Sequence, residues 1–138
     1  MLSNEDQTIL MLARSLPLVQ RHRDELLEGL EACLRGSEGP DEAFGQAEVT
    51  AMMLTELLIE EAAHLVGSGT FSALADVAAE HRALDIDGRH YSRFGDALAP
   101  VMKDVLGANL PPQVPAAWCD TFWRVIRAAQ GERETVAA

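Results

Sequence analysis

The stretch that decides the fold spans residues 81–107 and reads HRALDIDGRHYSRFGDALAPVMKDVLG. Its first residue, His81, falls on the apolar face of the helical pattern that precedes it, because Val77 and Leu74 lie four and seven positions earlier. A buried imidazole costs roughly 1 to 3 kcal/mol for each polar atom that is left without a partner. Something in the folded protein is therefore expected to bond to His81.

Helical spacing of the apolar residues continues through the whole chain, and no useful segment alternates apolar with polar residues as a half-buried strand would. We therefore predict an all-α protein with six to eight helices. A first helix opens at a capping box formed by Ser3 and Asp6 and is interrupted at Ser15 and Pro17, and a second helix follows and ends at Gly36.

The second half of the pattern predicts four more helices. A long helix is expected over residues 48–66 and a shorter one over 71–81, followed by two that carry their apolar faces over 91–105 and 118–129. Phe44 lies before them in the turn-rich segment GSEGPDEAFGQ, as an isolated aromatic in a connection. The inner face of the last helix is expected to be Trp118, Phe122, Val125, Ile126 and Ala129.

Length and charge limit the classes of function. The 138 residues fit one domain, 1–138, in which we expect residues 131–138 to form a frayed tail. The 22 acidic and 11 basic residues give a formal net charge of −11, which disfavours nucleic acid or an anionic membrane as a partner. The N-terminal residues do not resemble a signal peptide, and no apolar run approaches the ~18 to 20 residues of a membrane span.

The cysteines and the other histidines are expected to have no chemical role. Cys33 and Cys119 form no CxxC or CxxCH motif, which favours a reducing cytoplasm, and we expect both to be inert buried thiols. We expect His90 to be solvated in the turn before a helix. His22 and His64 are expected at the surface.

The block that begins at His81, together with PPQVPAAWCDTFWRVI at 111–126, resembles the second half of bacterial single-domain globins and of the globin domain of flavohaemoglobins. In that family a proximal histidine is followed ten residues later by a tyrosine that opens the next helix. His81 and Tyr91 match this spacing.

Further matches lie on both sides of this pair. The family carries a glycine soon after the tyrosine and an Ala-Trp pair that opens the last helix, which Gly95 and Ala117-Trp118 match. Residues 2–19 resemble the family's first helix, and Phe44 falls where the family packs a phenylalanine on the porphyrin face. The resemblance covers nearly the whole chain and is weaker in its first half.

The resemblance implies a globin fold around haem b, held without a covalent bond because CxxCH is absent. His81 would be the metal ligand, and the opposite iron position would bind a diatomic gas: dioxygen, nitric oxide or carbon monoxide. Backbone carbonyls near Val77 are expected to hold the second ring nitrogen of His81, with Tyr91 hydrogen bonding in the same region. The haem contacts are expected from His81, Phe44, Val77, Tyr91, Leu30, Val49, Met53 and Phe94.

The gas-binding side departs from the family pattern. Flavohaemoglobin-like globins usually place a tyrosine where Leu30 lies, and a glutamine or histidine where Val49 lies. A charge-assisted hydrogen bond is worth roughly 1.5 to 3 kcal/mol, so its loss should weaken retention of dioxygen more than binding of carbon monoxide or nitric oxide. Thr50 could instead supply a hydroxyl on the gas-binding side, or Met52 or Met53 could lie over the iron. Glu132 and Glu134 are the candidates for the carboxylate that completes a His-Tyr-Glu network on the His81 side in flavohaemoglobins.

Three hypotheses of function follow. The first is a haem protein that binds a diatomic gas and carries, scavenges or reports it. The second is a globin-fold sensor or interaction module without haem, against which the retained His81 argues. The third is a nitric oxide dioxygenase that relies on a separate reductase, which the apolar Leu30 and Val49 disfavour. The oligomeric state is left open.

Overall fold

The computed structural model describes residues 3–36, 40–74, 76–86, 88–107 and 110–137, and the side chains of residues 36–46 and 131–137 lie outside this description. Within these ranges the chain contains helices and no strand, which confirms the all-α prediction. No helix of the described chain is long and apolar enough to cross a membrane. The described residues form six helices: α1 (Asn4–Arg21), α2 (Arg23–Gly36), α3 (Pro40–Ser68), α4 (Val77–Ala83), α5 (Gly88–Leu106) and α6 (Gln113–Ala137).

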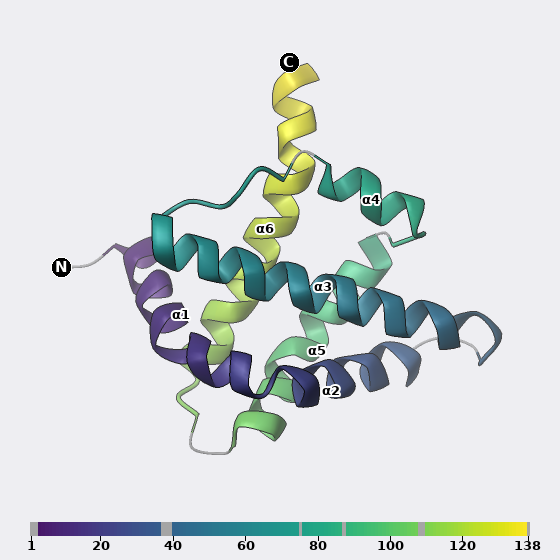
Figure 1. Cartoon of the computed structure of the whole chain (residues 1–138), viewed down its shortest axis with the longest axis horizontal. Coiled ribbons are helices and arrows are strands. Elements are labelled where there is room, and N and C mark those ends of the chain that lie inside the picture. Colours follow the sequence, from purple (N-terminus) through teal and green to yellow (C-terminus); the bar gives the residue numbers. More distant parts are fainter. Residues whose placement is uncertain (1–2, 37–39, 75, 87, 108–109, 138) are drawn as a thin grey trace.

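The helices pack around one main core, with α4 set apart from it (Figure 1). Helix α2 lies between α3 and α5, while α6 packs against α1 and α5. The main core includes the buried face of α6, where Trp118, Phe122 and Ile126 are almost fully covered. A second, small apolar cluster of Leu74, Val125 and Ala129 joins the segment before α4 to α6. All five residues predicted for the inner face of the last helix are buried.

Helix α1 begins as predicted but does not stop where we expected. The Ser3 Oγ accepts a hydrogen bond of 3.0 Å from the backbone N–H of Asp6, which caps the helix. The predicted interruption at Ser15 and Pro17 is wrong, because α1 continues to Arg21. The Ser15 hydroxyl donates back to the Met11 carbonyl at 2.7 Å and accepts the Trp118 Nε1–H at 2.8 Å, so a bond to the core holds this residue in the helix.

Helix α3 is longer than predicted. It begins at Pro40, a residue type suited to the first turn of a helix, so Phe44 lies in α3 and the prediction of a turn-rich connection there is wrong. The side chain of Phe44 lies outside the described residues. The helix ends as expected, since Gly69 has φ +82° and its N–H bonds to the Leu65 carbonyl at 2.8 Å.

Helix α4 is shorter than the predicted helix over residues 71–81. It begins at Val77, and the chain from Thr70 to Leu74 is irregular. A buried carboxylate explains this difference: Glu61 of α3 accepts hydrogen bonds from the Ser72 hydroxyl and from the Ser72 N–H, the latter at 2.8 Å. The side chain of Glu61 thus supplies the acceptor that a preceding helical turn would have given.

Two glycines allow helices of the core to approach closely. A Cβ on Gly29 of α2 would lie 2.7 Å from Val101 of α5, and a Cβ on Gly95 of α5 would lie 2.7 Å from the Trp123 indole of α6. Real Cβ atoms do not make contacts this short. The glycine that the resemblance singled out at position 95 is therefore required by helix packing.

We expect Gly95→Ala to lower the free energy of unfolding by about 1 to 3 kcal/mol, because the new methyl group overpacks the contact with Trp123. Gly67→Ala is the matched control, since nothing lies within 4 Å of its Cβ position in α3. That variant should gain up to about 1 kcal/mol from helix propensity. Urea unfolding of both variants measures the difference, and equal stability would contradict the packing argument.

Candidate functional site

His81 lies in the last turn of α4 and is only 2% exposed. Its Nδ1 is 2.8 Å from the Oη of Tyr91, which lies in the first turn of α5. The turn between the two helices is tied to the same histidine, because the backbone N–H groups of Leu84 and Ile86 both donate to the His81 carbonyl, at 3.0 and 2.8 Å. The buried side chain of Ile86 anchors this turn in the core. The spacing of ten residues thus brings the imidazole and the phenol together.

Burial favours the neutral form of the His81 imidazole. Desolvation lowers its pKa below the usual value of 6.5, and the negative charge of Glu80 offsets part of this effect. The other ring nitrogen, Nε2, has no hydrogen-bond partner among the described residues. If the hydrogen lies on Nδ1 and is donated to Tyr91, Nε2 presents a free lone pair, the form in which imidazole binds a metal. The partner predicted for Nδ1, a backbone carbonyl near Val77, is replaced by the Tyr91 hydroxyl.

His81 lines a cleft of about 250 Å³ between α3 and α4. Helix α4 packs on α6 beside this cleft, and the small cluster that contains Leu74 is packed by Leu57 of α3 and by Val77 of α4. Its volume is close to the lower limit of the ~300 to 1,000 Å³ typical of small-molecule pockets. Its lining residues are Met53, Glu56, Leu57, Glu60, Glu61, Ser72, Ala73, Leu74, Val77, Glu80 and His81.

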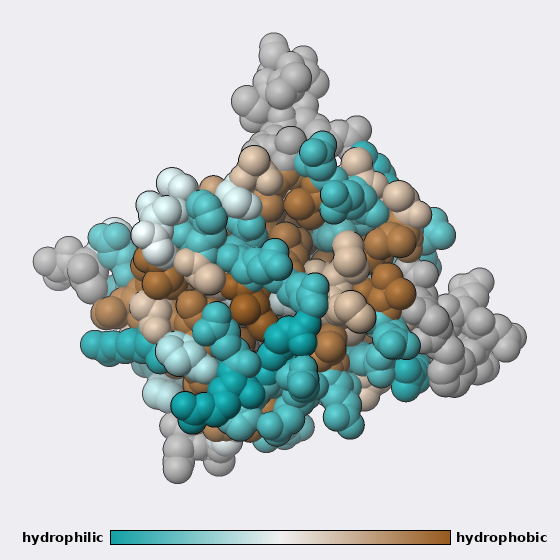
Figure 2. Space-filling model, viewed as in Figure 1, coloured by the Kyte–Doolittle hydropathy of each residue, from teal (hydrophilic) through white to brown (hydrophobic). Residues whose placement is uncertain are grey.

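The face of α3 that leads to this cleft is apolar and uncovered. Val49 and Met52 are 39% and 40% exposed and lie about one turn before the cleft residues Met53 and Glu56 on the helix surface. In Figure 2 apolar side chains gather in the region between α3 and α4. Val49 and Met52 thus extend the apolar part of this α3 wall beyond the cleft.

Four of the predicted site residues meet at this cleft: His81, Val77 and Met53 line it, and Tyr91 bonds to His81. Val49 is exposed on the neighbouring turn of α3. The alternative residue Met52 shares this exposed face, whereas Thr50 is fully buried and its hydroxyl has no hydrogen-bond partner.

Leu30 and Phe94 lie elsewhere in the protein. Both are buried and line a small apolar pocket of about 10 Å³, together with Trp118. Among the predicted site residues, the side chain of Phe44 lies outside the described residues, as do those of the proximal alternatives Glu132 and Glu134.

Sequence analysis missed the carboxylates of the cleft. Glu56 and Glu60 follow Met53 by three and seven positions, so the helical period places them on one face of α3. The helical spacing of these residues from Met53 could have predicted them from the sequence.

Two side chains are also placed differently from our prediction. His90 is buried at 6% exposure because the first turn of α5 turns it inward, and Cys33 is exposed, so it is not a buried thiol. Cys119 is half-buried, and burial raises the pKa of its thiol, which lowers its reactivity.

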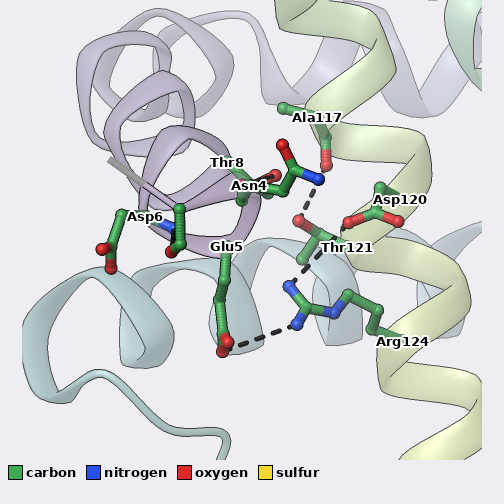
Figure 3. Close-up of polar contacts among 9 residues, drawn as sticks. Asn4, Glu5, Asp6, Thr8, Ala117, Asp120, Thr121 and Arg124 are labelled. Atoms are coloured by element: carbon green, nitrogen blue, oxygen red, sulfur yellow. Dashed lines mark hydrogen bonds and ion pairs between the residues drawn. The ribbon is translucent and has the colours of Figure 1, made fainter. Parts of the chain in front are cut away.

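A second groove, of about 410 Å³, lies between α1 and α6. Near it, Arg124 of α6 pairs with Glu5 of α1 at 3.5 Å and with Asp120 at 3.8 Å (Figure 3). The pair with Glu5 joins the start of α1 to α6, and the pair with Asp120 lies within α6. The described residues of the groove include no histidine or cysteine, so it offers no ligand or nucleophile comparable to His81.

The donor groups of the described residues decide which kind of metal centre fits. They contain no group of three or more His, Cys, Asp or Glu side chains that could hold a metal ion. An ion bound by protein ligands alone is therefore not supported in this part of the chain. A metal that arrives with its own equatorial ligands and needs one neutral imidazole, as haem iron does, fits the single free nitrogen of His81.

We expect the free energy of unfolding of the chain without ligand to fall as the pH drops below about 6.5, the ordinary pKa of histidine. The pKa of His81 is lowered in the folded protein. In this pH range the unfolded chain therefore binds a proton at His81 that the folded chain does not bind. Urea unfolding at pH 7.5 and 5.5 measures the loss. The loss should be smaller in His81→Gln, and an equal loss in both proteins would show that His81 does not contribute.

Comparison with known proteins agrees with this geometry. The family model for globins matches residues 42–129, a range that contains His81, Tyr91, and both walls of the cleft. No curated protein matches the chain. Since the family match covers well over half of the sequence and the described fold is all-α, the chain belongs to the globin family.

Proposed function

We propose that this globin binds haem b without a covalent bond, with His81 as the only protein ligand of the iron and a diatomic gas in the opposite position. The observation that carries the proposal is the His81 imidazole: it is buried, burial favours its neutral form, and its Nδ1 is bonded to Tyr91. Its Nε2 has no hydrogen-bond partner among the described residues, and the residue lines a cleft. A family whose members usually bind haem supports the same cofactor.

The two walls of the cleft would hold the porphyrin by different contacts. Val77 and Leu74 lie on the side of His81, and Met53 and Leu57 line the α3 side. The exposed side chains of Val49 and Met52 extend this second wall beyond the cleft, and a flat apolar cofactor would cover them. The haem supplies an iron atom that coordinates a gas, while the chain excludes water and holds the imidazole in one orientation through Tyr91.

The gas-binding side supports simple binding more than catalysis. Val49, where related globins usually place a hydrogen-bond donor, is apolar, and Leu30 is packed in the core. Without a donor, a dioxygen complex is held less firmly than a carbon monoxide complex. A nitric oxide dioxygenase with a separate reductase is accordingly disfavoured, and a haem-free sensor is disfavoured by the free nitrogen of His81.

The finer assignments belong to the same proposal. We infer that residues 1–138 form a single globin domain similar to bacterial single-domain globins and to flavohaemoglobin globin domains, with residues 131–138 as its tail. Helix α6 runs to Ala137, so this tail is at least partly helical. The cysteine pattern favours a cytoplasmic protein.

Recombinant protein titrated with hemin should give an intense Soret band at about one haem per chain, and the reduced form should shift this band with carbon monoxide. His81→Ala should abolish the band or weaken it greatly, because it removes the iron ligand. His64→Ala is the control, since His64 is an exposed histidine of α3 whose Nδ1 lies 2.7 Å from the Thr70 carbonyl. An unchanged spectrum in His81→Ala would end the proposal.

Tyr91→Phe tests the positioning role of the phenol. It removes the hydroxyl bonded to Nδ1 and keeps the ring, so we expect haem to bind about 10- to 100-fold more weakly, as for other lost partners of metal-bound histidines. Hemin titration followed in the Soret region gives the affinity. If Tyr91→Phe binds hemin as tightly as the wild type, the phenol does not position the ligand.

A further inference from the structure

Carboxylates form a large part of the lining of the His81 cleft: Glu56, Glu60 and Glu61 come from α3, and Glu80 comes from α4. Two of them have partners. Glu61 is buried and accepts hydrogen bonds from the N–H and the hydroxyl of Ser72. Its carboxylate is therefore bonded within the protein. Glu56 forms an ion pair with Arg23, the first residue of α2.

Glu60 differs from these two residues. Its side chain is exposed and lines the cleft, one turn of α3 after Glu56. It has no ion-pair partner among the described residues. Glu80 is also exposed and stands next to His81 on the opposite wall. The cleft therefore presents negative charge from both helices. Arg23 contacts the cleft residue Glu56 and already pairs with Glu56 and Asp24.

The negative charge of the cleft repels the two ionised propionate groups at the edge of haem. Like charges near a protein surface repel each other, and at ordinary ionic strength this repulsion reaches about 10 Å. By contrast, the apolar lining residues of the cleft and the free nitrogen of His81 favour binding of haem. The walls of the cleft thus attract the porphyrin ring, while its carboxylates repel the propionates.

We propose that Glu60, assisted by Glu80 and Glu56, is a specificity-determining residue that weakens binding of anionic porphyrins, so that the site holds haem in an exchangeable manner and prefers a porphyrin with uncharged side groups. Arg23 acts in the opposite direction by balancing the charge of Glu56. The inference rests on the proposed haem site and concerns its affinity and its selectivity for charge.

The first test compares Glu60→Gln with Glu28→Gln. Glu28 is an exposed residue of α2 that does not line the cleft, so both variants lose one negative charge and one of them changes the cleft. Hemin loss to excess serum albumin, followed by the decay of the Soret band, should be about two- to five-fold slower in Glu60→Gln. Glu28→Gln should lose hemin at the wild-type rate, and the effect of Glu60→Gln should shrink in 1 M salt.

The second test changes the charge of the porphyrin. With the dimethyl ester of hemin, which has no ionised propionates, Glu60→Gln and the wild type should lose the cofactor at equal rates. Arg23→Gln should lose hemin about two- to five-fold faster, with Arg14→Gln, an exposed residue of α1, as its control. Equal hemin rates in the wild type and Glu60→Gln, or the same change with the ester, would overturn the inference.

Metal-free protoporphyrin IX separates this inference from the proposed function, because its binding does not use the His81–iron bond. Fluorescence titration should show that Glu60→Gln binds protoporphyrin IX about two- to five-fold more tightly than the wild type does, and binds its dimethyl ester equally well. If hemin gives no His81-dependent Soret band, the proposed function fails. If the band forms and the porphyrins show no dependence on Glu60, the charge inference alone fails.

Discussion

The contact between the Nδ1 of His81 and the Oη of Tyr91 is the interaction on which the rest of the site depends. It joins α4 to α5 across a turn whose backbone N–H groups also bond to the His81 carbonyl. Side chain and main chain of one residue are thereby fixed together. A neutral imidazole with one nitrogen engaged has one orientation and one free lone pair, which is what a metal ligand requires.

The cleft that His81 lines follows from the way α4 is held. Its contacts run to α6 through the cluster of Leu74, Val125 and Ala129, whereas the main core is closed by the other helices. The side of α4 that faces α3 borders the cleft, and α3 exposes Val49 and Met52 on the turn before the cleft residues. The separation between two apolar clusters is therefore a property of the packing that creates room for a flat ligand.

Sequence reasoning succeeded where a signal was local. The helical periods gave the fold class and the inner face of α6, and the spacing of His81 and Tyr91 gave their contact. It failed where a tertiary contact overrode a local preference: Ser15 stays helical because it bonds to Trp118, and Ser72 leaves the helix because it bonds to Glu61. Bonds between residues so distant in the chain leave no periodic trace.

The uncovered face of α3 also bears on stability. Full burial of a Val or Met side chain contributes roughly 1.5 to 3 kcal/mol, so covering the part of Val49 and Met52 that is now exposed would add a fraction of that amount for each. A ligand that bridges α3 and His81 would also add contacts between α4 and α3. Since binding to the folded state alone stabilises that state, α4 should be the element whose local stability depends most on the ligand.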